Sequence, residues 1–87
     1  MENVKLIYFY LKTCRECRRQ EEEFEARPPR YELRRVEAYS EAGPPLMRKY
    51  RVTDVPTTVV VDECDRLVHM FIDFHTAADI EDWLARR

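Results

Sequence analysis

The segment Val4–Tyr10 restricts the fold more than any other part of the chain, because nearly every residue in it is apolar. Its branched and aromatic side chains favour a β-strand. A strand that is apolar on both faces must be covered on both faces, which is the pattern of a central strand in a parallel sheet. We therefore predict that this strand lies inside a sheet with helices on both sides.

A helix is predicted directly after this strand, over residues 14–26. The segment contains no proline or glycine and is rich in arginine, glutamine and glutamate, which are good helix formers. Pro28-Pro29 ends the helix, since the residue before a proline is disfavoured in helical conformation. We expect the buried stripe of this helix to consist of Cys17, the aliphatic part of Glu21, and Phe24.

The middle of the chain predicts two strands that flank a short helix. Residues 31–39 form a weaker second strand, because their apolar positions are partly out of phase. The turn at Gly43-Pro44-Pro45 leads into a helix that ends near Arg51, since proline suits the first helical positions. Residues 57–61 are all β-branched and predict a third strand.

The last third of the chain predicts a hairpin and a final helix. A polar turn at 62–65 leads into alternating residues over 66–74, which is typical of an antiparallel hairpin. Thr76 can cap the last helix, with Asp79 three residues further on as in a capping box. We expect the buried stripe of this helix to consist of Ala77, Ile80, Trp83 and Leu84.

The predicted order of elements is therefore βαβαββα. A strand-helix-strand beginning requires a right-handed crossover between parallel strands, whereas the closing hairpin is antiparallel. These connections predict an α/β fold with one four-stranded mixed sheet and helices on both faces. A chain of 87 residues leaves no room for a second core, so we expect one domain over residues 1–87.

Composition excludes several classes of function. Fifteen basic and seventeen acidic residues give a formal charge of −2, which lacks the excess positive charge of a dedicated nucleic-acid binder. We interpret Arg15, Arg18 and Arg19 as a solvated helix face rather than a binding patch. The early apolar run Leu6–Leu11 is too short for a signal peptide or a membrane span. We therefore expect a cytoplasmic protein that does not bind membranes.

The pair Cys14 and Cys17 carries the chemistry that the sequence predicts. In a reducing compartment, two cysteines at this spacing indicate metal binding or redox chemistry. Cys14 lies at the start of a helix, where unpaired N–H groups and the helix dipole favour a thiolate, and Arg15 adds a cation. Glu16 opposes this effect. We expect the pKa of Cys14 to lie below that of a free cysteine, with the more buried Cys17 as the resolving thiol.

A structural zinc site is the alternative that these cysteines leave open. Cys64, with His69 or His75, would have to complete the set of ligands. Structural zinc sites usually combine two closely spaced pairs, whereas Cys64 lies far along the chain in a separate turn. We expect no metal, an incidental exposed thiol at Cys64, and the two histidines on the surface of a strand.

The chain resembles the thioredoxin family over nearly its full length. A strand, a Cys-x-x-Cys pair and a helix are followed by the segment Lys49–Thr57, which is similar to the family's segment before the third core strand. This resemblance implies that Pro56 is a cis proline facing the cysteines, and that the backbone of Val55 pairs with an extended substrate. The approach Tyr10–Thr13 looks more like that of the glutaredoxin branch.

The sequence also departs from the family pattern. Tyr8 replaces a buried aspartate that accepts a proton from the second cysteine, and Arg15-Glu16 replaces a dipeptide that usually contains proline or glycine. Asp73 aligns with a glycine near the end of the hairpin. It could act as a replacement base or a substrate filter, or it could simply face water. The paired-glycine motif of glutaredoxins is absent, so the resemblance does not imply a preference for glutathione.

The resemblance implies a thiol-disulfide oxidoreductase that acts on protein disulfides. A disulfide reductase or a low-molecular-weight thiol would supply the electrons. We expect a monomer without a bound cofactor, since the two thiols hold the electrons. The expected substrate-binding residues are Thr13, Arg15, Val55 and Pro56. A redox-silent module that presents a groove beside Pro56 remains the alternative.

Overall fold

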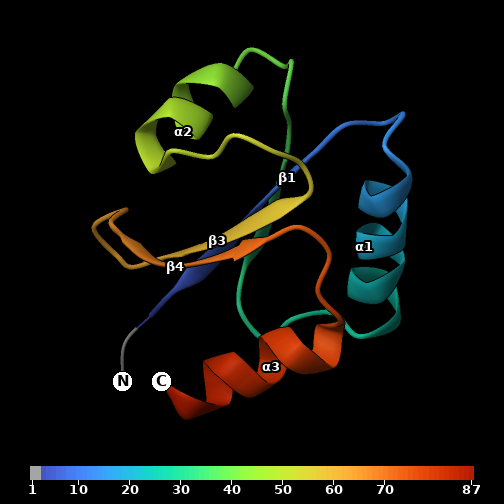
Figure 1. Ribbon diagram of the computed structural model, residues 1–87. Coiled ribbons are helices and arrows are strands. Elements are labelled where there is room, and N and C mark those ends of the chain that lie inside the picture. The colour runs from blue at the N-terminus through green and yellow to red at the C-terminus, as the bar shows by residue number, and fades with distance from the viewer. Residues whose placement is uncertain (1–2) are drawn as a thin grey trace.

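The computed structural model describes residues 3–87, which form one twisted sheet with helices on both faces (Figure 1). The elements are β1 (Lys5–Tyr10), α1 (Arg15–Ala26), β2 (Leu33–Glu37), α2 (Gly43–Tyr50), β3 (Thr57–Val61), β4 (Leu67–Ile72) and α3 (Ala77–Arg86). The strand order is β2-β1-β3-β4, with β1 parallel to β2 and the other two neighbouring pairs antiparallel. The predicted four-stranded mixed sheet is confirmed.

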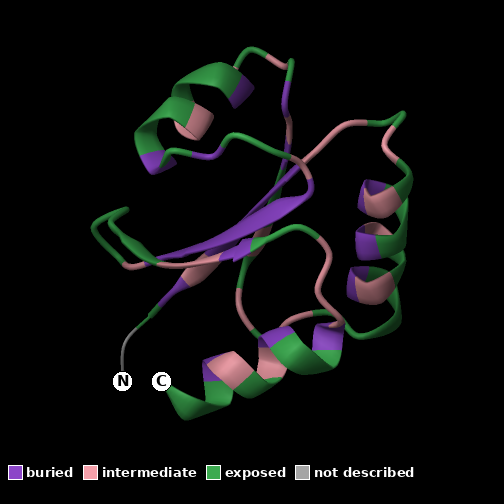
Figure 2. Ribbon diagram, in the orientation of Figure 1, coloured by how far each residue is buried: buried purple, intermediate pink, exposed green. Residues whose placement is uncertain are grey.

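The two faces of the sheet carry separate apolar clusters. On one face, α1 and α3 cover Leu6 and Tyr8 of β1 through side chains such as Phe24 and Ile80. On the other face, α2 covers the second cluster, whose buried members are Ile7, Phe9, Val36, Tyr50, Val52, Val59 and Val61. The central strands β1 and β3 are accordingly the most completely buried elements (Figure 2). The apolar character of β1 on both faces is thus explained by helices on both sides.

The helix α2 packs closely against the end of β2. Gly43, the only glycine in the chain, is the first residue of α2. A Cβ atom at this position would overlap the backbone carbonyl of Ala38. Glycine is therefore required here because two backbone segments approach each other, not because of an unusual backbone conformation.

The structure corrects the expected buried stripe of α1. Cys17 and Phe24 are buried as expected, but the third buried residue is Gln20, with 1% of its surface exposed, and not the aliphatic part of Glu21. Gln20 is tolerated inside because its amide exchanges two hydrogen bonds with the backbone of His75, both at 2.9 Å. A polar side chain can therefore replace an apolar one where a loop supplies both partners.

The other elements agree with the sequence except at their ends. The second strand covers only Leu33–Glu37 of the predicted 31–39, and β4 ends at Ile72 instead of residue 74. The predicted cap of α3 is confirmed, since the Thr76 hydroxyl accepts a hydrogen bond from the Asp79 N–H at 3.1 Å. The buried stripe expected for α3 is wrong at Trp83, which is only half-buried, because its ring stacks on that of His69 at the surface.

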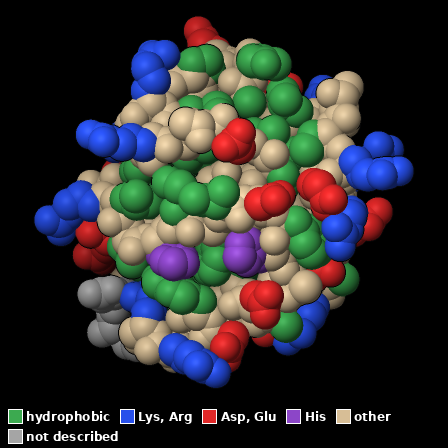
Figure 3. All heavy atoms as spheres, viewed as in Figure 1, with side chains coloured by type: hydrophobic (Ala, Val, Ile, Leu, Met, Phe, Trp, Pro, Cys, Tyr) green, Lys and Arg blue, Asp and Glu red, His purple; other side chains and the backbone are tan. Residues whose placement is uncertain are grey.

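The strand β4 lies at an edge of the sheet and carries exposed apolar side chains. Figure 3 shows hydrophobic side chains gathered over α2 and along β4. The exposed large hydrophobic residues of β4 are Leu67, Val68 and Ile72. No helix within residues 3–87 has the length and apolar character that crossing a membrane requires.

Candidate active site

Cys14 occupies the N-cap position of α1, at the end of the short turn that follows β1. Its backbone is extended (φ −88°, ψ 119°), and its sulfur accepts a hydrogen bond from the Cys17 N–H at 3.1 Å. Its own N–H donates to the Leu11 carbonyl at 3.2 Å, which closes the turn. The Cys14 sulfur therefore takes the place of the oxygen that usually caps a helix, beside N–H groups that favour negative charge.

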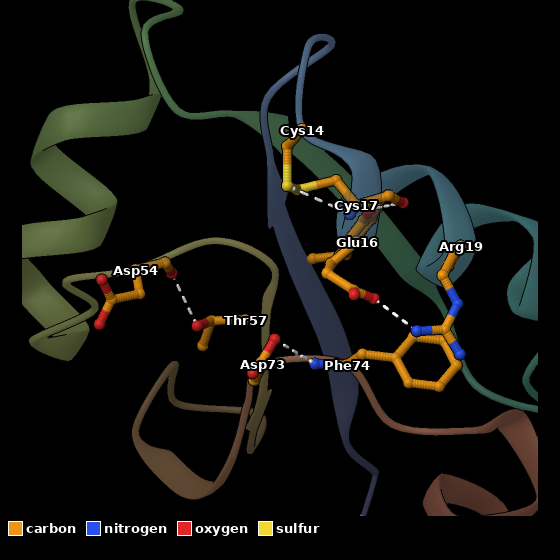
Figure 4. Close-up of a disulfide and its surroundings, with 9 residues drawn as sticks. Cys14, Glu16, Cys17, Arg19, Asp54, Thr57, Asp73 and Phe74 are labelled. Atoms are coloured by element: carbon orange, nitrogen blue, oxygen red, sulfur yellow. Dashed lines mark hydrogen bonds and ion pairs between the residues drawn. A yellow bond between two sulfur atoms is a disulfide. The ribbon is translucent and has the colours of Figure 1, made fainter.

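Cys14 and Cys17 form a disulfide, and their Cα atoms are 5.1 Å apart (Figure 4). Cys14 is partly exposed, whereas only 2% of the surface of Cys17 is exposed. The two sulfurs therefore differ in accessibility in the way that an attacking and a resolving cysteine require.

Tyr8 holds the helix turn that carries Cys17. Its buried hydroxyl donates to the Cys17 carbonyl at 2.6 Å. Burial is the largest cause that raises the pKa of Tyr8, and the nearby negative charge of Glu21 adds to it. The phenol therefore stays protonated and remains a hydrogen-bond donor. Tyr8, at the position where the resemblance implied a buried aspartate, thus contacts the backbone of Cys17.

The charge of Glu16 is engaged by a neighbouring cation. Its carboxylate lies 2.6 Å from the Arg19 guanidinium, which in turn lies 4.1 Å from the ring centre of Phe74 (Figure 4). Arg15 is exposed at the first position of α1 and has no ion-pair partner within residues 3–87. The opposition that Glu16 offers to a Cys14 thiolate is therefore reduced, while the contribution of Arg15 is retained.

The Val55–Pro56 peptide bond is cis, as the resemblance implied. The loop that contains it lies opposite the disulfide in Figure 4, between the labelled residues Asp54 and Thr57. The Thr57 hydroxyl donates to the Asp54 carbonyl at 2.7 Å and thereby holds the loop. Within residues 3–87, the backbone of Val55 makes no hydrogen bond, so its N–H and carbonyl are available to a partner.

Asp73 adopts the left-handed conformation (φ 71°), which explains why it aligns with a glycine. Its N–H donates to the Pro56 carbonyl at 2.9 Å, so the end of β4 is tied to the cis-proline loop. Its exposed carboxylate accepts a hydrogen bond from the Phe74 N–H at 2.8 Å. In the described part of the chain this carboxylate has no hydrogen bond to either cysteine. Its role as a base or a filter stays a prediction.

A hollow of about 300 Å³ lies beside the cysteine pair, between the end of β1, α1 and β2. It is lined by Tyr8, Tyr10, Leu11, Lys12, Cys17, Arg18, Glu21 and Arg35. Glu21 and Arg35 form a two-pronged ion pair across it, with N···O distances of 2.7 to 3.0 Å. The nearly buried residue Cys17 therefore borders this hollow as well as the apolar core.

The remaining sequence candidates do not assemble into a metal site. Cys64 is an exposed free thiol in the turn between β3 and β4, whereas His69 and His75 pack around Phe71 and Trp83. Among the residues that the structure describes, no group of three or more histidine, cysteine, aspartate or glutamate side chains could hold a metal ion. Thr13 is exposed in the turn directly before Cys14.

Sequence reasoning missed Gln20, which joins the cysteine-bearing helix to the loop before α3. The available signal was its position three residues after Cys17, on the same helix face. A glutamine is usually exposed, however, so composition alone assigns it to the solvated face. Only the loop around His75, which is 55 residues away, makes its burial favourable.

Comparison with known proteins identifies the fold. No protein-family model matches the chain, and no curated protein matches its sequence. A thioredoxin from Trypanosoma brucei brucei matches with a TM-score of 0.79 and 17% identity, over 95% of this chain and 73% of that one. Desulfothioredoxin from Desulfovibrio vulgaris Hildenborough matches with a TM-score of 0.75 and 23% identity, over 98% and 82%.

Thioredoxin-2, described as a component of the protein secretion machinery of the malaria parasite, matches with a TM-score of 0.78 and 20% identity, over 99% of this chain and 84% of that one. These identities are too low to transfer an activity, but the coverage includes every strand and helix. The chain therefore has the thioredoxin-like fold, with a disulfide-bonded Cys-x-x-Cys pair at the start of its first helix.

Proposed function

We propose that the protein is a thiol-disulfide oxidoreductase that exchanges its Cys14–Cys17 dithiol with protein disulfides. The observation that carries this proposal is the environment of the two sulfurs. The accessible Cys14 sulfur accepts a backbone N–H at the start of α1, and it is bonded to the nearly buried Cys17. This arrangement supplies an ionisable nucleophile and a second thiol within reach of it.

The exchange proceeds in two displacements. The Cys14 thiolate of the reduced protein attacks one sulfur of a substrate disulfide, which forms a mixed disulfide and releases the first substrate thiolate. The Cys17 thiol then loses its proton to solvent and attacks the Cys14 sulfur, which releases the second substrate thiolate. Two electrons pass to the substrate, and both thiolates take up protons from water. The protein ends in the disulfide form that the structure contains.

The cis-proline loop is the expected docking site for substrate. The unpaired N–H and carbonyl of Val55 suit an extended peptide that adds to the loop as a strand would. Pro56 has no N–H and adds no charge near the sulfurs. We expect Thr13 and Arg15 to border the same peptide, because they flank Cys14 and are exposed.

The catalytic cycle closes when the disulfide is reduced again. A disulfide reductase or a low-molecular-weight thiol would supply two electrons, and the two sulfurs carry them without a bound cofactor. Cytoplasmic thiols are kept reduced, so a cytoplasmic location suits a protein that acts as a reductant.

Reduction of insulin, with dithiothreitol as the electron donor, tests the proposal. The Cys14→Ser variant should lose at least about 100-fold of the activity, because the nucleophile is removed. The Cys64→Ser variant is the matched control, since it removes an exposed thiol away from the pair. If Cys14→Ser were as active as the parent, the redox proposal would be wrong, and a redox-silent interaction module would be the better explanation.

A further inference from the structure

We propose that the hollow beside the cysteine pair binds a carboxylate of the substrate, and that Lys12 and Arg18 provide the positive charge. This inference rests on the proposed function and names its substrate class. The preferred substrates would be disulfide-bonded proteins with an aspartate or glutamate one or two residues from the reactive cysteine.

The position of the hollow suits a residue next to the substrate cysteine. Lys12 lies two residues before Cys14, and Arg18 directly follows Cys17, so these two cations flank the cysteine pair in sequence. Both line the same hollow as Cys17. An extended peptide advances about 3.3–3.6 Å per residue. We therefore place the carboxylate one or two residues, or roughly 3–7 Å of extended peptide, from the sulfur that is bonded to Cys14.

The charge in the hollow is not balanced by the protein itself. Three cations and one carboxylate line it, but Glu21 forms a two-pronged ion pair with Arg35. Lys12 and Arg18 have no ion-pair partner within residues 3–87. The carboxylate of Glu16, in the first turn of α1, is engaged by Arg19. Two positive charges are therefore left to attract an anionic group from outside.

The walls of the hollow add shape to charge. Tyr10 and Leu11 provide an apolar side against which the aliphatic part of an acidic side chain can pack. Tyr10 is held by stacking on the buried ring of Tyr8, with 5.4 Å between ring centres. Because the Tyr10 ring is already held in place, this wall loses little conformational entropy when the carboxylate binds.

Two peptides that differ only by a carboxylate or a carboxamide in one side chain test the inference. Each carries a single disulfide, with either aspartate or asparagine directly beside the reactive cysteine. We expect the reduced protein to use the aspartate peptide with roughly fivefold higher kcat/KM at low salt, since two exposed cations contribute modestly. The preference should decrease at about 0.5 M salt, because screening shortens the range of the attraction.

The Lys12→Gln/Arg18→Gln double variant should reduce this preference to about one. The matched control is Arg30→Gln/Arg34→Gln, which removes two exposed cations that do not line the hollow and keeps the net charge change equal. The control should keep the roughly fivefold preference. Because each result is the ratio of the kcat/KM values for two substrates, a general change in thiol reactivity affects both values equally and cancels.

A carboxylate could also come from a low-molecular-weight thiol, so a second arm compares glutathione disulfide with its neutral ethyl ester. A charge preference in the peptide arm supports the inference. A preference that appears only in the glutathione arm overturns the assignment to protein substrates. Equal use of both peptides by the parent protein also overturns the proposed carboxylate preference, while leaving the proposed function intact. If the parent reduced neither peptide nor insulin, the proposed function itself would fail.

Discussion

The start of α1 and the turn between β3 and β4 both carry a cysteine, but they use the neighbouring N–H groups differently. In α1, the sulfur of Cys14 accepts the N–H of Cys17 at 3.1 Å. In the turn, the carboxylate of Asp62 accepts the N–H groups of Cys64 and Arg66, at 2.8 and 3.0 Å. At the start of α1, a backbone N–H group donates to the cysteine sulfur. In the turn, the backbone N–H groups donate to the Asp62 carboxylate instead of to the Cys64 sulfur.

The two segments also differ in what covers them. Cys17 lies on the buried face of α1, and Tyr8 and Gln20 tie this helix to β1 and to the loop before α3. Cys64 is exposed, and no hydrogen bond described for residues 3–87 involves its sulfur. The comparison teaches that the two cysteine segments differ in their hydrogen-bond donors and in their cover, which are the properties that control the reactivity of a thiol.

The largest expected effect concerns the hydrogen bonds that tie α1 to the loop before α3. The Gln20→Ala variant should lower the free energy of unfolding by about 3 kcal/mol, because two partly buried hydrogen bonds to His75 are lost and their backbone partners are left unpaired. Urea denaturation of the oxidised protein measures this difference. Cys64→Ala is the control in the other segment and should change stability by less than about 0.5 kcal/mol. If both variants lost the same free energy of unfolding, the proposed difference in cover between the two segments would be wrong.

The second prediction concerns the reactivity of the thiols themselves. At pH 7, Cys14 of the reduced protein should react with iodoacetamide about threefold faster than Cys64, since its larger thiolate fraction outweighs its weaker nucleophilicity. The advantage of Cys14 should shrink as pH rises above its lowered pKa, because its thiolate fraction then no longer increases. Peptide mapping by mass spectrometry measures both rates. Parallel pH profiles for the two thiols would contradict the proposed activation of Cys14.

A smaller effect is expected from the cation next to Cys14. Arg15→Gln should slow alkylation of Cys14 at about pH 6 by roughly twofold, since an exposed cation stabilises the thiolate only modestly. Cys64 in the same sample serves as an internal reference and should keep its rate. Arg34→Gln removes an exposed cation from β2 and should leave both rates unchanged. A rate for Cys14 that did not respond to Arg15 would leave the helix N-terminus as the cause of activation.

The smallest effect concerns the turn around Cys64. The Arg66 N–H is the largest cause that lowers the pKa of Asp62, and the Cys64 N–H adds to it. Because this pKa is depressed in the folded state, its contribution to stability is present above the unfolded pKa and is lost as pH falls through the folded pKa. Asp62→Asn should therefore show a weaker loss of stability between about pH 5 and about pH 2 than the parent. Identical acid profiles would contradict this.

The sequence predicted the elements well where one physical cause acts alone. The apolar run of β1 required cover on both faces, the β-branched run of β3 required a strand, and the Thr76–Asp79 spacing required a cap. It was less accurate at Gln20, because the burial of that side chain depends on the backbone of a distant loop. The strand over 31–39 was predicted too long, since an edge strand ends where its single neighbour ends.

The sequence by itself determined that a cysteine pair would lie where a buried strand meets a helix, because hydrophobic period, helix propensity and cysteine spacing are local properties. Only the tertiary structure decided what surrounds that pair. The cis-proline loop lies opposite the disulfide, Arg19 packs over the ring of Phe74, and Arg35 of β2 pairs with Glu21. Such contacts join residues that are remote along the chain, so their energies depend on packing that no local pattern records.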